Sequence, residues 1–433
     1  MHKVTLLNEN HALLLNDDDN KPWRMKVSKE NQDKRFFISW NQRIYNQRDN
    51  IDLAIDWIVE HTKIRLQARS LPTYRKLCEV ILLNLGKSLL QRRWLQIPRG
   101  SSAYEKGTQP YQLNFSKRHV DEIIRVLVSS DSIFEVKGAK YLKDPQFSAY
   151  QPTEQFNIQI ALETLSSVDL GPNELVRITN KGRELTDEEM LTVKQDEADL
   201  RKINDYLLDK SFPLKGPMIR IYSKKVGSCG RIYCDFQALA KRRVPLRQFS
   251  LIEGERIAEV DIVSSHPRMM IQEYFNQKIS RTFYQDIADE LDITRDKVKH
   301  YFVVAIGSGS RDKARNGFVG KAYGYDKHDF NTLHNWVTLN YPDAPLYRHW
   351  SFVAMNNEGE ILKEVMLRGV DANKPVLPIH DAVAVKVSDI DWATKTLKDV
   401  WRDFFGRDYC EVDVEVADIE DLLPSSLIPP PHI

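Results

Sequence analysis

Apolar residues at helical spacing predict three helices in the first part of the chain. Their apolar faces run through residues 51–59, 77–85 and 120–128, and Ser116 is the expected N-cap of the third helix. Two short β-prone runs follow, at 133–138 and 155–158. This part is therefore expected to be a mainly helical unit that ends in a two-stranded ribbon.

Three helices followed by a ribbon are the order of a winged helix-turn-helix, a fold that binds DNA through one of its helices. Lys117 and Arg118 follow the cap of the third helix and are candidate contacts to phosphate groups. A helical domain with an ordinary solvated face explains the same pattern without DNA.

The remainder of the chain has two different patterns. Residues 163–226 are polar and mostly helical, and Thr186 and Glu189 have the spacing of a capping box. From residue 227 to 425 short strands alternate with helices. Within that part, apolar runs at 375–379 and 383–385 flank His380 and Asp381, which predicts a hairpin with these two residues at its tip.

A further short strand, residues 259–263, carries Asp261 and follows the turn-like residues 253–255. Two carboxylates on adjacent strands can hold a pair of divalent ions about 3.5–4 Å apart, the arrangement used for nucleotidyl transfer. Asp261 and Asp381 are the candidates for such a pair. The alternative is that an Asp at a strand end or hairpin tip is a solvated turn former.

Four basic residues in this part suit phosphate groups. Arg231 and Arg247 precede the strand of Asp261 and are candidate contacts to a nucleic-acid backbone. Arg295 and Lys299 stand four residues apart in a predicted helix, so they share one face and repel one another unless an anion lies between them. An incoming triphosphate is such an anion. A solvated basic face is the plainer interpretation of this pair alone.

Composition limits the class of protein. At 433 residues the chain is too long for one ordinary domain, and its 42% hydrophobic and 28% charged residues are typical of a globular protein. The net charge of +1 gives no global nucleic-acid signature, so any basic surface is local. No apolar run approaches the roughly 20 residues that span a bilayer, and no signal peptide is expected. The four scattered cysteines suit a reducing, cytoplasmic location.

The order of the motifs in residues 227–425 resembles the polymerase core of the family A DNA polymerases and the related single-subunit phage-type RNA polymerases. The matching elements are, in chain order, Gly230-Arg231 (the Thr-Gly-Arg element), residues 261–268 (motif A), Arg295 and Lys299 (the Arg-x-x-x-Lys of motif B), Glu358-Gly359 (usually Gln-Gly) and His380-Asp381 (motif C).

The chain also departs from the family's pattern. His266 stands where the DNA polymerases usually have a Glu that helps to exclude ribose, which leaves ribonucleotide use open. Ala382 follows His380-Asp381 where the family usually has Glu or Ser, and Ile306-Gly307 is one residue out of register with the Tyr-Gly of motif B. Nothing upstream resembles a proofreading exonuclease.

The resemblance implies an α+β fold: a right-hand polymerase core with an antiparallel palm sheet, helical fingers and a reduced thumb, preceded by a mainly helical, winged-helix-like domain. The expected parts are a polar N-terminal segment (1–50), the helical DNA-binding domain (51–162), a helical connector or small thumb (163–226), palm and fingers (227–425) and a Pro-rich tail (426–433).

The resemblance also implies a metal site of two Mg²⁺ ions, with Mn²⁺ as an alternative. Its ligands would be Asp261, Asp381 and the backbone carbonyl of Ile262.

Further residues would contact the substrates. Arg295 and Lys299 would neutralise the triphosphate. His266 would lie beside the sugar, and His380 would position the primer end. Contacts to nucleic acid are expected from Arg231, Arg247, Glu358, Lys117 and Arg118.

The expected function is template-directed nucleotidyl transfer by a short family A-like primase or polymerase of a phage, plasmid or other mobile element. Its partners would be a DNA template and nucleoside triphosphates, with a helicase or single-strand-binding protein as a further candidate. Among enzymes, a gap-filling DNA polymerase or a small DNA-dependent RNA polymerase is the alternative. From another class, a DNA-binding replication initiator or regulator with an inactive polymerase-like domain also fits.

Overall fold

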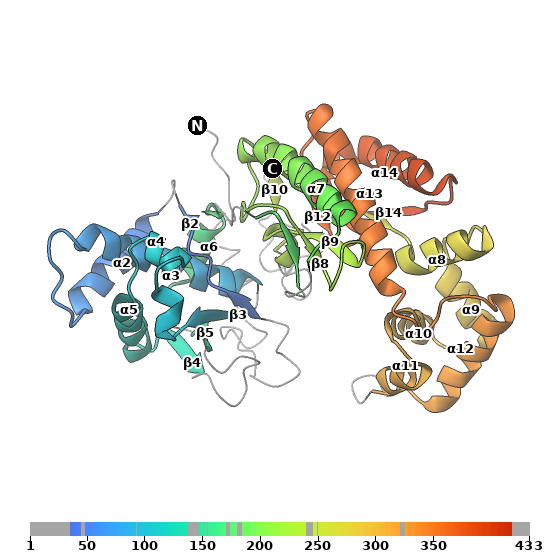
Figure 1. Ribbon diagram of the computed structural model, residues 1–433, viewed down its shortest axis with the longest axis horizontal. Helices are drawn as coiled ribbons and strands as arrows, with labels where there is room; N and C mark the ends of the chain where they lie inside the picture. The colour runs from blue at the N-terminus through green and yellow to red at the C-terminus, as the bar shows by residue number, and fades with distance from the viewer. Residues whose placement is uncertain are drawn as a thin grey trace, which may run out of the picture.

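The computed structural model of this chain describes residues 35–44, 48–91, 93–136, 147–153, 155–169, 174–179, 184–239, 246–248, 250–320 and 325–417. It has an α+β fold with two lobes, the first of which is built from residues 35–164 (Figure 1). No helix in the described part of the chain is long and apolar enough to cross a membrane.

The first lobe packs helices against a small mixed sheet. The sheet has the order β1 (Arg35–Phe37), β3 (Trp94–Pro98), β5 (Phe147–Pro152), β4 (Ile133–Val136), and only the β1–β3 pair is parallel. Its helices are α2 (Asp49–His61), α3 (Leu71–Gln91), α4 (Gln109–Gln112), α5 (Lys117–Ser129) and α6 (Ile158–Thr164), with a short 3₁₀ helix η3 (Ser101–Tyr104).

The three predicted helices of this lobe are confirmed as α2, α3 and α5, and the Ser116 side chain caps α5 by accepting from the His119 N–H. The predicted ribbon is wrong in two respects. Its second strand is β5, whereas residues 155–157 lie outside any strand and Ile158 begins α6. The ribbon also belongs to a four-stranded sheet, because β3 and β1 extend it. Residues 35–50, expected in a polar N-terminal segment, contribute β1, β2 (Gln42–Arg43) and the start of α2.

A three-stranded sheet and a long helix follow the first lobe. The sheet has the order β7 (Val176–Ile178), β8 (Ile219–Tyr222), β9 (Cys229–Tyr233), the helix is α7 (Asp187–Leu208), and β6 (Val168–Asp169) pairs with β2. The capping box predicted for α7 is confirmed. Its two hydrogen bonds run from the Glu189 N–H to Thr186 Oγ1 at 3.2 Å and from the Thr186 N–H to Glu189 Oε2 at 3.0 Å.

The second lobe is built on an antiparallel sheet of five strands. Its order is β10 (Leu251–Ile252), β11 (Glu255–Ile262), β13 (Ala382–Lys386), β12 (Leu377–Ile379), and β14 (Val412–Val416) also pairs with β11. The predicted hairpin is confirmed, since β12 and β13 are joined by His380 and Asp381 alone. The strand β11 therefore lies between β13 and β14.

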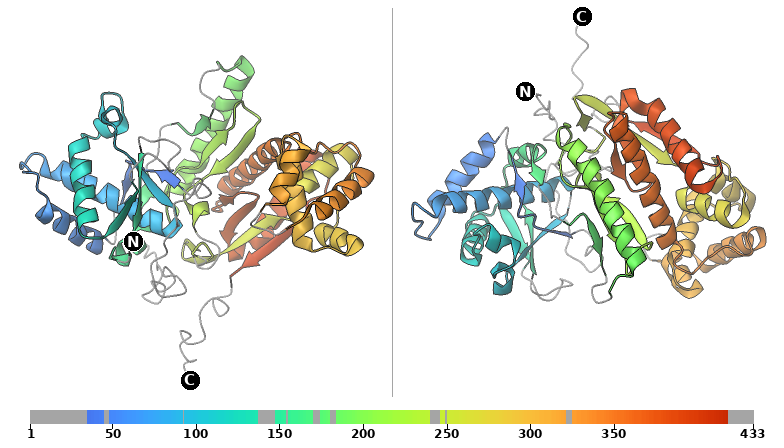
Figure 2. Two further views of the ribbon diagram at one scale, coloured as in Figure 1. Left: turned by 90° about the horizontal axis from the view of Figure 1, so that it is seen from below. Right: turned by 45° about the horizontal axis from the view of Figure 1, so that its top comes forward.

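Helices cover this sheet and extend beyond it. The helices α7, α13 (Ser351–Asp371) and α14 (Ile390–Phe405) lie side by side (Figures 1 and 2). After β11 come α8 (Ser265–Phe275), α9 (Phe283–Leu291), α10 (Arg295–Gly307), α11 (Arg311–Phe318) and α12 (Lys327–Asn340), which form a helical group beside the sheet (Figure 1). Short 3₁₀ helices η4 (Phe236–Ala238) and η5 (Val387–Asp389) complete the lobe.

Buried hydrophobic residues form two clusters, and α3 connects them. One cluster spans residues 38–160, and the other contains Leu89 and Leu90 of α3 together with residues 161–412. Lys87 of α3 makes an ion pair with Asp235, and the Gln91 side-chain amide donates to the Asp235 carbonyl oxygen at 3.2 Å. The long buried helix α3 thus ties the first lobe to the second.

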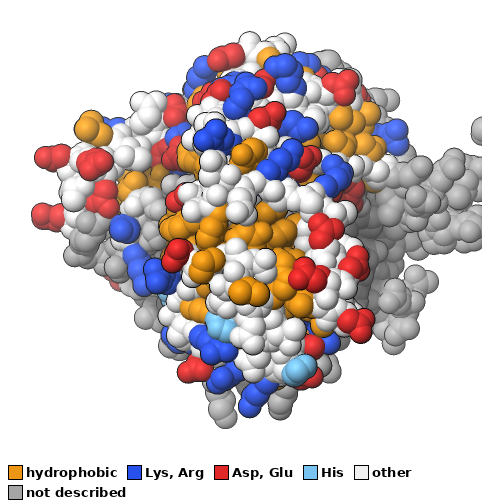
Figure 3. Space-filling view, turned by 90° about the vertical axis from the view of Figure 1, so that its right-hand side faces the viewer, with side chains coloured by type: hydrophobic (Ala, Val, Ile, Leu, Met, Phe, Trp, Pro, Cys, Tyr) orange, Lys and Arg blue, Asp and Glu red, His pale blue; other side chains and the backbone are white. Residues whose placement is uncertain are grey.

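The face of the second lobe that lies farthest from the first lobe is partly apolar. Figure 3 shows hydrophobic side chains gathered at the centre of this face and charged ones around them. Large exposed apolar residues of this lobe include Tyr274 on α8, Leu339 on α12 and Phe404 on α14. Part of the apolar surface of the lobe is therefore open to solvent.

Candidate active site

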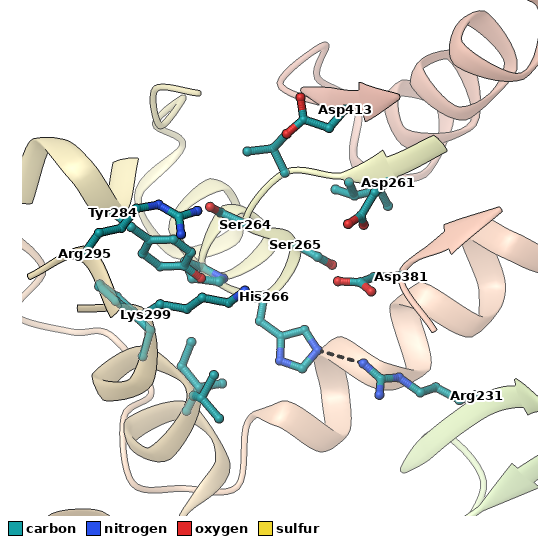
Figure 4. Close-up of a pocket in the computed structure, with 16 residues that line it drawn as sticks. Arg231, Asp261, Ser264, Ser265, His266, Tyr284, Arg295, Lys299, Asp381 and Asp413 are labelled. Carbon is teal, nitrogen blue, oxygen red and sulfur yellow. Dashed lines mark hydrogen bonds between the residues drawn. The ribbon is translucent and has the colours of Figure 1, made fainter. Parts of the chain in front are cut away.

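Asp261 and Asp381 come from distant parts of the chain and meet at the ends of two adjacent strands. Asp261, near the end of β11, pairs directly with Ala382, the first residue of β13, and so lies beside Asp381. The Ile262 N–H also donates to the Asp381 carbonyl oxygen at 3.3 Å. The two carboxylates lie close together at one side of a pocket (Figure 4).

The hairpin tip holds Asp381 in place. His380 and Asp381 form the whole connection between β12 and β13, and His380 adopts the left-handed region with a φ of +53°. That region is uncommon for a residue other than glycine, and here the two-residue turn requires it. The His380 side chain is exposed and Asp381 is half-buried.

A pocket of about 290 Å³ opens in front of the two carboxylates. Its walls are the end of β11 with the start of α8, one side of α9 and α10, the hairpin tip, and Arg231 from β9 (Figure 4). Ser264 joins β11 to α8 in a left-handed conformation, with a φ of +53°. This sharp turn brings Ser265 and His266, the first residues of α8, to the pocket.

Helix α10 presents two cations to the pocket across from the carboxylates. Arg295 and Lys299 are exposed and point into the cavity (Figure 4). The Arg295 guanidinium lies over the ring of Tyr284, 5.8 Å from its centre. As expected, Val298, Phe302 and Ala305 of the same helix are buried, and Phe302, one helical turn after Lys299, also lines the pocket. The two cations therefore lie on one side of the pocket, and the two carboxylates lie on the other.

Glu358 of α13 is fully buried and is held by three side chains. Its Oε2 accepts from Arg231 Nε at 2.8 Å and Nη2 at 2.5 Å. Its Oε1 accepts from Ser265 Oγ at 2.8 Å and lies 3.1 Å from His266 Nε2. His266 Nε2 is also 3.4 Å from Arg231 Nη2 (Figure 4). Glu358 thus links β9, α8 and α13 at the edge of the pocket.

Two glycines let β9 approach α13 closely enough for this cluster to form. A Cβ on Gly359 would lie 2.0 Å from the Gly230 carbonyl oxygen, and a Cβ on Gly230 would lie 2.5 Å from the Asn356 side-chain oxygen. Gly230 also has a φ of +61°, which favours glycine. The Gly-Arg and Glu-Gly dipeptides, far apart in the sequence, are therefore in direct contact.

Negative charge accumulates around Asp381. Burial, and then the nearby Glu358 carboxylate, raises the pKa of Asp381. Burial acts in the same direction on Glu358, but the hydrogen bonds and charges of His266 and Arg231 hold the pKa of Glu358 below its usual value. A cation in the pocket would therefore be stabilised by the ionised Asp381.

Known proteins give little guidance for this chain. No protein-family model matches it, and no curated protein matches it. Among solved structures it is similar to the POL domain of Pol1 from M. smegmatis in complex with DNA primer-template and dNTP. The sequence identity is 15% and the TM-score is 0.28, and the match covers 52% of this chain and 51% of that chain. The chain thus spans about half of that structure, and a likeness this weak carries no conclusion.

The donor set at the pocket fits Mg²⁺. This ion prefers oxygen ligands and is usually bound by one or two carboxylates together with waters and substrate phosphates. Asp261 and Asp381 supply two carboxylates side by side at the pocket. Burial first, and then the Glu358 charge, raises the pKa of Asp381, and a bound cation would favour its ionised form. No group of three or more His, Cys, Asp or Glu side chains that could hold a metal ion occurs among the described residues. Further ligands would therefore be backbone, water or substrate oxygens.

Two residues expected to contact nucleic acid are buried, and a contact of either with nucleic acid stays a prediction. Arg247 is 7% exposed, and its Nε and Nη2 donate to the two oxygens of Glu259 at 2.8 and 3.3 Å. Its Nη1 donates to the Gln237 carbonyl oxygen at 3.0 Å. Glu358 is 0% exposed and bound as described above. Each would have to break these contacts to reach a ligand, so both stabilise the fold around the site.

Lys117 and Arg118 begin α5 and lie in the other lobe from the pocket (Figure 1). Arg118 is exposed, whereas Lys117 makes a 2.5 Å ion pair with Asp121, which Arg99 also contacts at 2.8 Å. This surface carries both signs of charge among the described residues. Contact of α5 with DNA stays a prediction.

Some residues at the pocket carry no clear mark in the sequence. Tyr284 is buried beneath Arg295, and burial raises the pKa of its phenol, but it stands in an ordinary apolar helix face. Asp413 lies opposite Asp261 on β14 and makes an ion pair with Arg281. The alternation of valine and acid over 412–416 is the signal that could have identified that strand.

Proposed function

We propose that this protein is a template-directed nucleotidyltransferase whose reaction takes place between Asp261, Asp381 and helix α10. The observation that carries the proposal is the convergence of the two carboxylates on one side of a pocket that has Arg295 and Lys299 on the other. A pair of carboxylates facing a pair of cationic side chains suits a metal-bound triphosphate, because the carboxylates bind the metal and the cationic side chains bind the phosphates.

Asp261, Asp381 and the Ile262 backbone carbonyl would hold Mg²⁺, or Mn²⁺, in this proposal. When bound, two such ions activate the attacking hydroxyl and stabilise the leaving oxygen of an in-line displacement. The carboxylates must be ionised to act as ligands. Because burial and Glu358 raise the pKa of Asp381, acidic pH would weaken metal binding by this residue before an ordinary Asp would protonate.

The other side chains position the substrates. Arg295 and Lys299 would bind the triphosphate and neutralise the charge that develops on it. His266 would lie beside the sugar of the incoming nucleotide, with its ring held by Glu358. His380, exposed at the hairpin tip, would position the primer end, and Arg231, 3.4 Å from His266, would contact the template or primer backbone.

Within this class, we favour a short primase or polymerase of a phage, plasmid or other mobile element, related to family A. The residue order in 227–425 supports the family, and His266 in place of an acid leaves ribonucleotides acceptable. A gap-filling DNA polymerase and a small DNA-dependent RNA polymerase use the same groups. A helicase or single-strand-binding protein would be a further partner of such an enzyme, besides the DNA template and nucleoside triphosphates.

The proposal is tested by incorporation of labelled nucleotide on a single-stranded template with Mg²⁺. Wild type should incorporate, and Asp261→Asn and Asp381→Asn should each fall to background while binding DNA as wild type does. Asp403→Asn, at an exposed position on α14, is the matched control and should keep full activity. Full activity of Asp381→Asn would refute the site.

The same assay separates the alternatives. Primer-free product from ribonucleotides supports a primase or RNA polymerase, and extension of a primer only, with deoxynucleotides, supports repair-type synthesis. The non-enzymatic alternative, a DNA-binding initiator or regulator, predicts no incorporation by wild type. It also predicts a shift of duplex DNA that weakens when Lys117 and Arg118 are neutralised.

A further inference from the structure

The three-stranded sheet β7-β8-β9 has one buried face and, among the described residues, one partly exposed face, the open face. Burial alternates along its strands, as expected when only one face packs. Arg220, Tyr222 and Ile232 point to the covered face, where Arg220 donates to Asp196 of α7 at 2.8 Å and to Asn356 of α13 at 3.2 Å. The intervening residues Ile219, Ile221, Arg231 and Tyr233 are partly buried, and Arg177 is exposed. The Arg231 side chain is 17% exposed and is paired with Glu358.

Two arginines lie in one row across the open face. Ile221 pairs with Arg177 of β7 on one side and with Arg231 of β9 on the other, so all three side chains project from the same face. Neighbouring strands are about 4.8 Å apart, which puts Arg177 about 10 Å from Arg231. Arg231 also lines the active-site pocket. The row therefore begins at the pocket and runs away from it.

Two lysines extend the positive charge at the tip of the β8–β9 hairpin. Lys224 and Lys225 are exposed, and Lys224 has a left-handed φ of +67° that turns the chain back toward β9. Within the described residues, Arg177, Lys224 and Lys225 form no salt bridge with an acid, whereas exposed cations elsewhere in this lobe, such as Lys202 and Lys395, do. These three charges are therefore available to an anionic ligand.

We propose that this open face binds the sugar-phosphate backbone of the primer–template duplex as it leaves the active site. The inference rests on the proposed function for the identity of the duplex. Phosphates of one strand follow each other at about 3.4 Å along the helix axis, so a row of about 10 Å spans about three nucleotides. Ile221, between the two arginines, gives an apolar surface for the sugars, and the continuity of the row with the pocket favours product duplex over a separate acidic protein.

The test measures duplex affinity without chemistry. Full-length protein is titrated onto a labelled primer–template duplex by fluorescence anisotropy, over a series of salt concentrations, with chelator and no nucleotide. Lys224→Gln/Lys225→Gln combined with Arg177→Gln should weaken binding and lower the slope of log K against log salt by about 0.9 for each phosphate that is no longer neutralised, hence by about 2–3. The control, Lys202→Gln/Lys395→Gln, removes two exposed charges elsewhere and should leave the slope unchanged.

The charge-conserving variant Lys224→Arg/Lys225→Arg separates charge from local folding and should bind as wild type does. An unchanged slope in the neutralised variant, or a wild type that does not bind duplex, overturns the inference. The outcome is distinct from that of the incorporation assay. A reduced slope in the neutralised variant, with no incorporation by wild type, would support the duplex-binding surface and refute the proposed enzyme activity. Incorporation by wild type, with an unchanged slope in the neutralised variant, would support the activity and refute the surface.

Discussion

Replacing Arg231 by methionine tests the buried cluster that supports the pocket. In wild type the Glu358 carboxylate, 0% exposed, receives two hydrogen bonds from Arg231, whose side chain is 17% exposed. Removing one partner of a buried ion pair costs about 3–5 kcal/mol, because the remaining charge is left without compensation. Ser265 and His266 still contact Glu358 in the variant, so the lower end of that range is expected at acidic pH.

The destabilisation caused by Arg231→Met should depend on pH, and the surroundings of Glu358 determine whether it grows or shrinks as the pH rises. In wild type the pKa of Glu358 is depressed. The ionised carboxylate therefore stabilises the folded protein above the unfolded pKa near 4.5, and this stabilisation is lost as the pH falls. Without Arg231, burial becomes the dominant influence and raises the pKa of Glu358 above that value. The folded variant then binds more protons than the unfolded one, and its stability falls as the pH rises.

Urea unfolding at pH 5 and pH 8, followed by tryptophan fluorescence, measures the effect. The destabilisation of Arg231→Met relative to wild type should be larger at pH 8, by about 1.4 kcal/mol for each unit by which the pKa of Glu358 has risen. Arg231→Met/Glu358→Gln carries no buried charge and should lose the pH dependence. Arg402→Met removes an arginine that is 51% exposed and should change stability by less than about 1 kcal/mol at either pH. If Arg231→Met destabilises the protein equally at both pH values, Arg231 does not act by compensating the buried charge of Glu358.

Three more outcomes are expected. Gly359→Ala should destabilise the protein by about 1–3 kcal/mol in the same unfolding assay, since the new Cβ would meet the Gly230 carbonyl oxygen at 2.0 Å. Arg247→Met should cost about 3–5 kcal/mol by removing the arginine that is paired with the buried Glu259, yet leave duplex affinity unchanged in anisotropy. Weaker binding by the folded variant would support the nucleic-acid role that burial argues against. Lys299→Ala should lower kcat/KM for nucleoside triphosphate by roughly 10- to 150-fold, equivalent to one charge-assisted hydrogen bond of about 1.5–3 kcal/mol, without altering duplex affinity.

The parts of the site that the sequence predicts depend on local patterns. The hairpin around His380 and Asp381 is predicted because two apolar runs flank a two-residue polar tip, and the structure forms it there. The common face of Arg295 and Lys299 follows from helical periodicity alone. In each case the residues that decide the geometry lie within one element, so no distant contact is needed to predict it.

The parts that the sequence does not predict depend on contacts between distant residues. Arg247 resembles a cation suited to phosphate until its partner Glu259 is known, and Glu259 lies twelve residues further along the chain, on β11. Glu358 looks like a solvated helix residue, because its partners Arg231 and His266 come from elements about 100 residues away in the sequence. The strand β3, an apolar run between two helices, becomes a strand only through its neighbours β1 and β5. Tertiary partners override the local pattern at these positions.

The two carboxylates stay together because apolar burial is worth more than their mutual repulsion. Two unit charges 4 Å apart repel by about 1–4 kcal/mol, depending on how much water screens them. On the face of these two strands opposite Asp261, each large apolar residue is at most 2% exposed and contributes about 1.5–3 kcal/mol: Val260, Ile262, Val383 and Val385. A slip of one residue would separate Asp261 from Asp381, but it would turn that face to the other side of the sheet and cost roughly 6–12 kcal/mol. The register that forces the acids together is therefore fixed by residues that take no part in the proposed chemistry.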